Sequence, residues 1–322
     1  MTAYIIKRLY GALPVIFLIT IFSYIIILSA PGDPTDMMIS PRTTPSERER
    51  IKSNLGLDKP VYIQYSIWLK NIVIKGDMGY SLINSRPVLE NILERFPATL
   101  LLMLTAYLLS LIISVPVGII SAVKKGSVFD NVFTLFSFLG LSMPSFWIAL
   151  MAIYFFGLKL GWFPTLGMSS LEGGCLFYGI TDVLWHLVLP ASILAFRNLA
   201  DWTRYIRSSM INVLKMDYIR TAEAKGLSER YVIYRHGLKN AMLPLITLMG
   251  LTLPDILSGA YIIEYIFSWH GMGRLGIEAI FHRDYPMIMG NILFSSVLVI
   301  ICNLIADIIY AWADPRIRYN VN

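Results

Sequence analysis

Hydrophobic positions along the 322-residue chain fall into six long runs separated by polar segments. The runs cover approximately residues 9–30, 98–123, 131–160, 183–199, 241–267 and 287–313. A helix of about 20 apolar residues spans a bilayer, and a backbone inside lipid must satisfy its own hydrogen bonds. The pattern therefore predicts six transmembrane helices. The fourth run is the weakest because it is short and contains His186 and Pro190.

The first run is interpreted as a retained helix and not as a signal peptide. Lys7 and Arg8 precede it, as in a signal peptide. The apolar run is longer than the about 7–15 residues typical of a signal peptide, and no small-residue cleavage motif closes it. We therefore expect residues 1–30 to form the first transmembrane helix.

Lysine and arginine residues predict the orientation of the helices, because short cytoplasmic loops are enriched in them. Lys7 and Arg8 precede the first run, Lys124 and Lys125 follow the second, and a cluster of eight follows the fourth. The loop after the third run, residues 161–182, contains neither residue type. Both termini are thus expected in the cytoplasm, with the long first loop outside.

Composition agrees with a membrane protein. The chain is 56% hydrophobic and 15% charged, whereas soluble proteins carry about 25% charged residues. Its two cysteines, Cys175 and Cys302, lie in different settings. This count is too low for a disulfide framework or a cysteine metal cluster.

The first loop, residues 31–97, is long enough to form a helical extracytoplasmic lobe. Helix-start and helix-stop signals divide it: Ser46 with Glu49 as a capping box, Gly56 as a stop, and Pro60 and Pro87 as starts. A turn is expected in GDMGYS, residues 76–81. Residues 98–322 are assigned to the membrane core with its five remaining helices.

A charged segment, residues 217–244, follows the fourth run, and with the residues before it forms a cytoplasmic loop at about 200–240. Asp217 is a plausible N-cap, Gly226 suits a left-handed turn, and Ser228 can cap a second helix. An apolar stripe then occurs at helical spacing: Leu227, Tyr231, Tyr234 and Leu238. The pattern favours a helix pair that docks a partner protein. The alternative is an amphipathic pair lying on the anionic inner leaflet.

Residues 221–244, TAEAKGLSERYVIYRHGLKNAMLP, resemble the EAA loop of ABC-importer permeases. Ala222, Gly226 and Leu238 match the general motif. Four positions depart from that motif and are similar to the dipeptide, oligopeptide and nickel group: Arg220, Thr221, His236 and Lys239. Other landmarks of this group occur in order: APGDP at 30–34, GDMGYS at 76–81, the run at 264–286 and ADPRIRY at 313–319.

This resemblance implies an all-α integral membrane protein with the type I importer (MetI-like) fold. It implies a permease subunit that imports short peptides by alternating access across a bacterial or archaeal cytoplasmic membrane. Nickel chelates or oligosaccharides are alternative substrates within the same machinery. The implied partners are a second, homologous permease, two cytoplasmic ATPases and an extracytoplasmic binding protein. The residues expected to couple to the ATPases are Asp217, Arg220, Ala222, Glu223, Ala224, Gly226, Leu227, Tyr231, Tyr234, His236 and Leu238.

Enzyme motifs are absent from the sequence. It has no G-x-x-x-x-G-K-[ST], H-E-x-x-H or G-x-S-x-G pattern, and its four histidines show no metal-ligand spacing. We therefore expect a permease without its own catalytic residues, metal or cofactor, whose ATP hydrolysis occurs in separate subunits. An ion-coupled secondary transporter is the competing class, but no internal repeat supports it.

Two further regions are candidates for the transport path. Asp255 and Ser258 follow Pro254 and are expected to line the passage, since ionisable groups inside membranes usually face a cavity or a partner. Alternatively, Asp255 caps a disturbed turn or pairs with a cation of a partner subunit. In the outer segment 269–285, we assign a gating or binding-protein contact to Gly271, Gly273 and Arg274. A re-entrant piece and a surface helix with solvated charges are the alternatives there.

Overall fold

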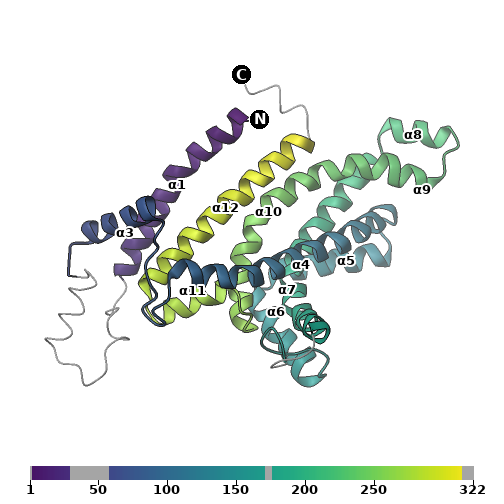
Figure 1. Cartoon of the computed structure of the whole chain (residues 1–322). Coiled ribbons are helices and arrows are strands. Elements are labelled where there is room, and N and C mark those ends of the chain that lie inside the picture. The colour runs from purple at the N-terminus through teal and green to yellow at the C-terminus, as the bar shows by residue number, and fades with distance from the viewer. Residues whose placement is uncertain (1, 30–57, 171–175, 314–322) are drawn as a thin grey trace. The chain divides into compact units, whose positions relative to one another are not determined.

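The computed structural model describes residues 2–29, 58–170 and 176–313, and within these ranges the regular elements are helices. In chain order they are α1 (Thr2–Ser29), α3 (Val61–Lys75), α4 (Val88–Val123), α5 (Val128–Ser142), α6 (Ser145–Ala152), η2 (Ile153–Lys159), α7 (Leu176–Val213), α8 (Asp217–Ala224), α9 (Glu229–Tyr231), η3 (Val232–Leu238), α10 (Lys239–Ile266), α11 (Met272–Phe281) and α12 (Tyr285–Ala313), where η denotes a π-helix (Figure 1). The predicted all-α class is confirmed. The chain divides into two compact units, Met1–Thr99 with His270–Ile301 and Leu100–Trp269 with Cys302–Asn322.

In the first unit, α3 packs against α1 through aromatic side chains. The ring of Tyr65 contacts Phe17 and Tyr24, with centroids 6.2 and 5.5 Å away. The Tyr65 hydroxyl also lies 3.0 Å from the hydroxyl of Thr20. Pro60 directly precedes α3, as the sequence predicted. The expected capping box at Ser46 and Glu49 and the stop at Gly56 lie outside the described residues.

The GDMGYS segment, residues 76–81, is tied to the start of α12 in the same unit, and the turn itself lies just after it at residues 82–84. Asp284 is fully buried, accepts a hydrogen bond from the Ser81 hydroxyl, and accepts another from the Met287 amide at 3.2 Å. Gly290 lies so close to Val88 that an added Cβ would overlap a Val88 methyl group. Buried apolar residues of α4, α11 and α12 complete this core: Val88, Ile92, Ala279, Met287 and Ile288.

The second unit is centred on α7. One of its cores contains three α7 residues at helical spacing, Trp202, Ile206 and Met210. They pack with residues from α4, η3 and α10: Ile119, Ala122, Ile233, Ala241 and Leu245. The ring of Tyr107 lies edge-on to Trp202 at 4.9 Å. This core holds the C-terminal part of α7 against α4, η3 and α10.

Pro87 directly precedes a helix, as the sequence predicted, and Pro190 does not end one. Pro190 lies inside the 38-residue α7, and α4 is a single 36-residue helix that contains both the third lobe helix and the second apolar run. The third run, in contrast, is broken at Pro144. Met143 takes an extended conformation (φ −92°, ψ 133°), because a residue before proline is disfavoured in the helical region.

Within the described ranges, four helices are long and apolar enough to cross a membrane: Tyr10–Ser29, Val88–Val123, Gly179–Val213 and Tyr285–Ile308. The broken third run adds a fifth if Val128–Gly140 and Ser145–Lys159, bent by 108°, form one span. The backbone of α10 also follows the predicted fifth run. The count of six spans is therefore not confirmed, although several apolar helices are.

Candidate functional site

The charged loop folds as a compact helix pair at the end of α7, formed by α8 and by α9 with η3 (Figure 1). Ile219 and Ala222 of α8 are buried against Val232 of η3 and Leu214. Residues on the opposite side of α8, including Glu223 and Ala224, are exposed. A small apolar core thus fixes the two helices to each other and to the end of α7.

Asp217 is not the N-cap that the sequence predicted. Met216 holds that position (φ −71°, ψ 149°), and Asp217 is the first helical residue. A carboxylate in the first turn still interacts favourably with the positive end of the helix dipole. Asp217 and Arg220 are 98% and 75% exposed and 3.8 Å apart, so their ion pair contributes little stability. Both charges are therefore free to face a partner.

Gly226 forms the turn between the two helices. Its φ of +76° is in the left-handed region, which favours glycine. Its amide donates to the Glu223 carbonyl at 2.9 Å, and the Leu227 amide donates to the Ala222 carbonyl at 3.4 Å. A Cβ at this position would meet no atom within 4 Å. Backbone conformation, and not packing inside this chain, is thus the reason for glycine.

The predicted apolar stripe is exposed at three of its four positions. Leu227, Tyr231 and Tyr234 are 40%, 49% and 58% exposed, whereas Leu238 packs against the α7 core. Leu238 is partly buried, so it contributes less to the exposed face than the other three residues. The cause is the π-helical η3, whose wider turn shifts the register expected from a regular α-helix. Val232, Ile233 and Gly237 form its buried face.

The exposed surface of the helix pair combines apolar and basic groups. We call it the loop face and define it by its exposed apolar residues: Met216, Tyr218, Leu227, Tyr231 and Tyr234. The same segment also exposes five cations: Arg220, Lys225, Arg230, Arg235 and Lys239. His236 contributes a ring 5.8 Å from that of Tyr231. Such an apolar face with charged edges suits protein docking.

The structure describes the candidate residues of the transport path and gate only in part. Asp255 and Ser258 belong to α10, but their side chains lie outside the described set. Gly271 precedes α11 and, like Gly273, is buried. Arg274 pairs with Glu278 one helical turn later at 2.6 Å. Partial burial, and then the charges of Arg274 and Arg95, lower the pKa of His270 below its ordinary value of 6.5, which favours the neutral ring at neutral pH.

Sequence reasoning missed an ion pair close to the helix pair. Arg207 of α7 donates to Asp130 of α5, with a second bond from Nη2 to Oδ2 at 2.8 Å. The Gly126 amide also donates to Asp130 at 2.9 Å. The Ser127 hydroxyl caps α5, and this helix start could have been predicted from the sequence. The ion pair could not, because its two residues are 77 positions apart and share no local sequence pattern. This contact ties the α4–α5 turn to α7.

Within the described ranges, no three His, Cys, Asp or Glu side chains are placed to hold a metal ion.

Two family models match the chain. The model described as "Binding-protein-dependent transport system inner membrane component" matches residues 114–319. The model for the N-terminal part of such membrane components matches residues 1–103. Together they match most of the chain and include the whole charged loop.

Curated relatives match the chain over nearly its full length. It is 46% identical over 320 residues to the oligopeptide transport system permease protein AppB of Bacillus subtilis, covering 99% of this chain and 100% of the relative. It is 39% identical to the dipeptide transport system permease protein DppB of Alkalihalophilus pseudofirmus, with the same coverage. It is 37% identical to the glutathione transport system permease protein GsiC of Escherichia coli K12, again covering 99% and 100%.

A solved structure of the MetNI methionine ABC transporter shares the fold. It aligns with a TM-score of 0.55 at 14% identity, covering 70% of this chain and 97% of the matched chain. At this identity the likeness concerns the fold alone. This structural alignment supports the fold expected from the sequence, which is that of a type I importer permease.

Proposed function

Because this chain belongs to the family of inner membrane components of binding-protein-dependent transport systems, we propose that it is the permease subunit of an ATP-driven importer of short peptides. The named relatives transport oligopeptides, dipeptides and glutathione, and this shared peptide chemistry supports the substrate class. Nickel chelates and oligosaccharides are the alternative cargoes. The proposed location is the cytoplasmic membrane, with both termini inside.

The loop face is the observation that carries this proposal. Leu227, Tyr231 and Tyr234 expose apolar surface although the chain buries Val232 and Ile233 beside them. We assign the loop face as the binding surface for a cytoplasmic ATPase subunit. A second ATPase subunit would bind the corresponding surface of a homologous partner permease. The basic edge suits an acidic rim on the ATPase, because complementary charge orients docking.

Force applied to the loop face reaches the apolar helices through packed contacts. α8 is fixed to η3 by Ile219, Ala222 and Val232. η3 continues directly into α10, and Ile233 packs into the core of α7. A displacement of the helix pair therefore acts on α7 and α10 together. In the proposed mechanism, ATP binding biases this movement, because the ATPases contact the loop differently in their two states.

The proposed transport path and gate follow the sequence prediction. Asp255 and Ser258 are proposed to line the passage, where a carboxylate would attract the amine of a peptide. Residues 269–285, with Gly271, Gly273 and Arg274, are proposed to contact an extracytoplasmic binding protein. The burial of Gly273 in α11 supports a rigid platform there.

An uptake experiment tests this function. The full-length chain, purified with its neighbouring subunits, is reconstituted into vesicles and given a radiolabelled dipeptide with its binding protein. We expect uptake that requires ATP on the cytoplasmic side of the membrane. Uptake should stop when the ATPase subunits are omitted. ATP-independent uptake by this chain alone would contradict the proposal and favour an ion-coupled transporter.

A further inference from the structure

One side of α7 carries polar and charged side chains along the half of the helix that leads to the charged loop. Arg197, Asp201, Arg204 and Ser208 follow one another at helical spacing, so they lie on the same side of the helix. Arg197, Arg204 and Ser208 are exposed and Asp201 is partly exposed, whereas Trp202 on the opposite side is fully buried. We call these four residues the polar stripe. All of them belong to the second unit.

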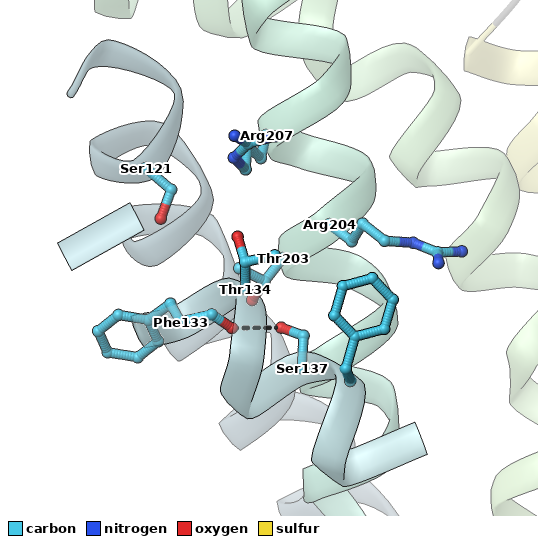
Figure 2. A pocket seen from close by; sticks show the side chains of 8 residues that line it. Ser121, Phe133, Thr134, Ser137, Thr203, Arg204 and Arg207 are labelled. Carbon is cyan, nitrogen blue, oxygen red and sulfur yellow. Dashed lines mark hydrogen bonds between the residues drawn. The ribbon is translucent and has the colours of Figure 1, made fainter. Parts of the chain in front are cut away.

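The two arginines at the end of the stripe region differ in what they contact. Figure 2 views the neighbouring pocket, and there the side chains of Arg204 and Arg207 extend from different sides of α7. Arg207 is bonded to Asp130 within the chain. The guanidinium group of Arg204 lies 6.0 Å from the centre of the Tyr205 ring and extends away from Ser121 in this view. Arg204 therefore leaves its charge on the exposed side of α7.

Contacts between α4 and α7 show how deep the polar stripe lies in the membrane. The Ser110 hydroxyl donates to the Ala195 carbonyl at 3.0 Å, across 85 positions of the chain. A Cβ added to Gly118 would be 3.2 Å from the Thr203 carbonyl oxygen, which gives the same offset. Arg197 is therefore level with residue 112 of α4, and the basic loop that begins at Lys124 lies about 18 Å further along that helix.

This depth places the first charges of the stripe inside the apolar core of the bilayer, which is about 30 Å thick. Asp201 is one helical turn nearer the loop than Arg197 and still within that core. Ionisable side chains are costly against lipid and usually face a water-filled cavity or a charged partner. Within the described ranges, Arg197 and Asp201 make no hydrogen bond or ion pair. The side of α7 that carries them is therefore not a lipid-facing surface.

The charges favour a water-filled path over a dry interface with a second permease. A dry interface would have to match each charge of the stripe with an opposite charge, because a buried unpaired charge is strongly unfavourable. Water solvates all of them without such a match. Arg197 and Asp201 also present opposite charges one helical turn apart. This arrangement complements a free peptide, whose two ends are a carboxylate and an ammonium group.

We propose that the polar stripe lines the transport path and binds the charged ends of the peptide during its passage. The guanidinium group of Arg197 donates to the peptide carboxylate, which arginine can bind through two parallel hydrogen bonds. The carboxylate of Asp201 accepts from the peptide ammonium group. Arg204 and Ser208 continue the polar surface toward the cytoplasm. This inference rests on the proposed function and adds to it a binding site for the peptide termini.

The first test measures water access and does not depend on the cargo. Arg197→Cys and Asp201→Cys are made in the full chain with Cys175 and Cys302 replaced, purified with the neighbouring subunits and reconstituted into vesicles. They are treated with a cationic methanethiosulfonate reagent, which reacts with thiols that water reaches. Ile112→Cys is the matched control, because Ile112 is apolar, 67% exposed and level with Arg197. We expect labelling at both stripe positions and little at residue 112.

Two results of this labelling would overturn the proposal. Unlabelled thiols at both stripe positions, with and without ATP, would place the stripe in a dry interface with the partner permease. Equal labelling of Ile112→Cys would show that water access does not follow the charges of α7.

The second test measures uptake of a radiolabelled dipeptide from saturating, peptide-loaded binding protein. We expect Arg197→Gln to slow uptake about tenfold, because it loses hydrogen bonds to a charged group, and Arg197→Lys to restore part of the rate. Asp201→Asn should also slow uptake. ATP hydrolysis stimulated by the binding protein should persist in these variants, which leave the loop face unchanged. Ile112→Cys should keep the native uptake rate.

The outcomes of the uptake test separate this inference from the proposed function. Native uptake rates in both Arg197→Gln and Asp201→Asn would overturn the role of the stripe and leave the importer function intact. Loss of stimulated ATP hydrolysis together with uptake would also overturn it, since the changes would then act on the fold and not on the peptide. Absence of uptake by the native complex would instead contradict the proposed function, a result on which the labelling of the stripe does not depend.

Discussion

Gly226 is the residue whose role is most sharply defined by its conformation. Its φ of +76° strains any side chain with a Cβ, and a β-branched residue is strained most. We predict that Gly226→Val leaves membrane insertion intact but uncouples ATP hydrolysis from peptide uptake, because the local cost of about 1–2 kcal/mol displaces the turn. Parallel assays of ATPase activity and uptake in vesicles measure this.

Asparagine provides the control at the same position, because it tolerates the left-handed region better than other residues with a side chain. Gly226→Asn should retain most of the coupling. Since a Cβ at Gly226 meets nothing within 4 Å, a loss of function in both variants would point to a partner surface that requires the bare backbone. Full coupling in Gly226→Val would contradict the conformational role.

Gly290 has the opposite reason for being glycine. A Cβ there would overlap a methyl group of Val88. We predict that Gly290→Ala lowers the free energy of unfolding by about 1–3 kcal/mol through overpacking, detected as a lower thermal midpoint in detergent. Gly11→Ala is the control, because nothing lies within 4 Å of its Cβ; there alanine should be neutral or stabilising. Equal midpoints for the two variants would refute this packing argument.

At the scale of elements, the ion pair between α5 and α7 predicts an asymmetry between its two partners. The side chain of Asp130 is 2% exposed and that of Arg207 is 27% exposed. Arg207→Gln leaves a buried carboxylate without its cation, whereas Asp130→Asn leaves a cation that still reaches water. We predict that Arg207→Gln destabilises by about 3 kcal/mol and Asp130→Asn by less.

Thermal midpoints of the two single variants and of the double variant measure this asymmetry. The double variant should be less destabilised than the sum of the single changes, because the two residues interact directly. Equal effects of the single changes, combined additively in the double variant, would show that the ion pair contributes nothing.

The elements also show which local signals can be read from a sequence. Pro60, Ser127 and Gly226 act at helix ends as local chemistry predicts. Pro190 does not end α7, because tertiary packing of Leu189 and Ala191, both buried, holds the helix together across it. The π-helical η3 that turns Leu238 inward has no clear sequence pattern. Periodicity assumes a regular α-helix, so it did not indicate the partial burial of Leu238.

At the scale of the whole molecule, hydrophobic runs and ordered motifs were sufficient to predict the all-α class and the family. They did not settle the number of spans, because a bend at Pro144 and a long continuous α4 depend on packing between distant segments. The Asp130–Arg207 pair was equally beyond reach, since it joins residues of two helices that are 77 positions apart in the chain. The helix pair was predictable because its turn, caps and apolar spacing are local.

Photo-crosslinking from the loop face tests the central claim most directly. In the assembled transporter, with Cys175 and Cys302 replaced, a photoreactive label is attached to a cysteine at Leu227 or Tyr231, which are exposed, or at the buried control Val232. The account predicts that the two exposed positions label an ATPase subunit and that Val232→Cys does not. Labelling of phospholipid alone from Leu227→Cys and Tyr231→Cys, with the ATPases present, would contradict it.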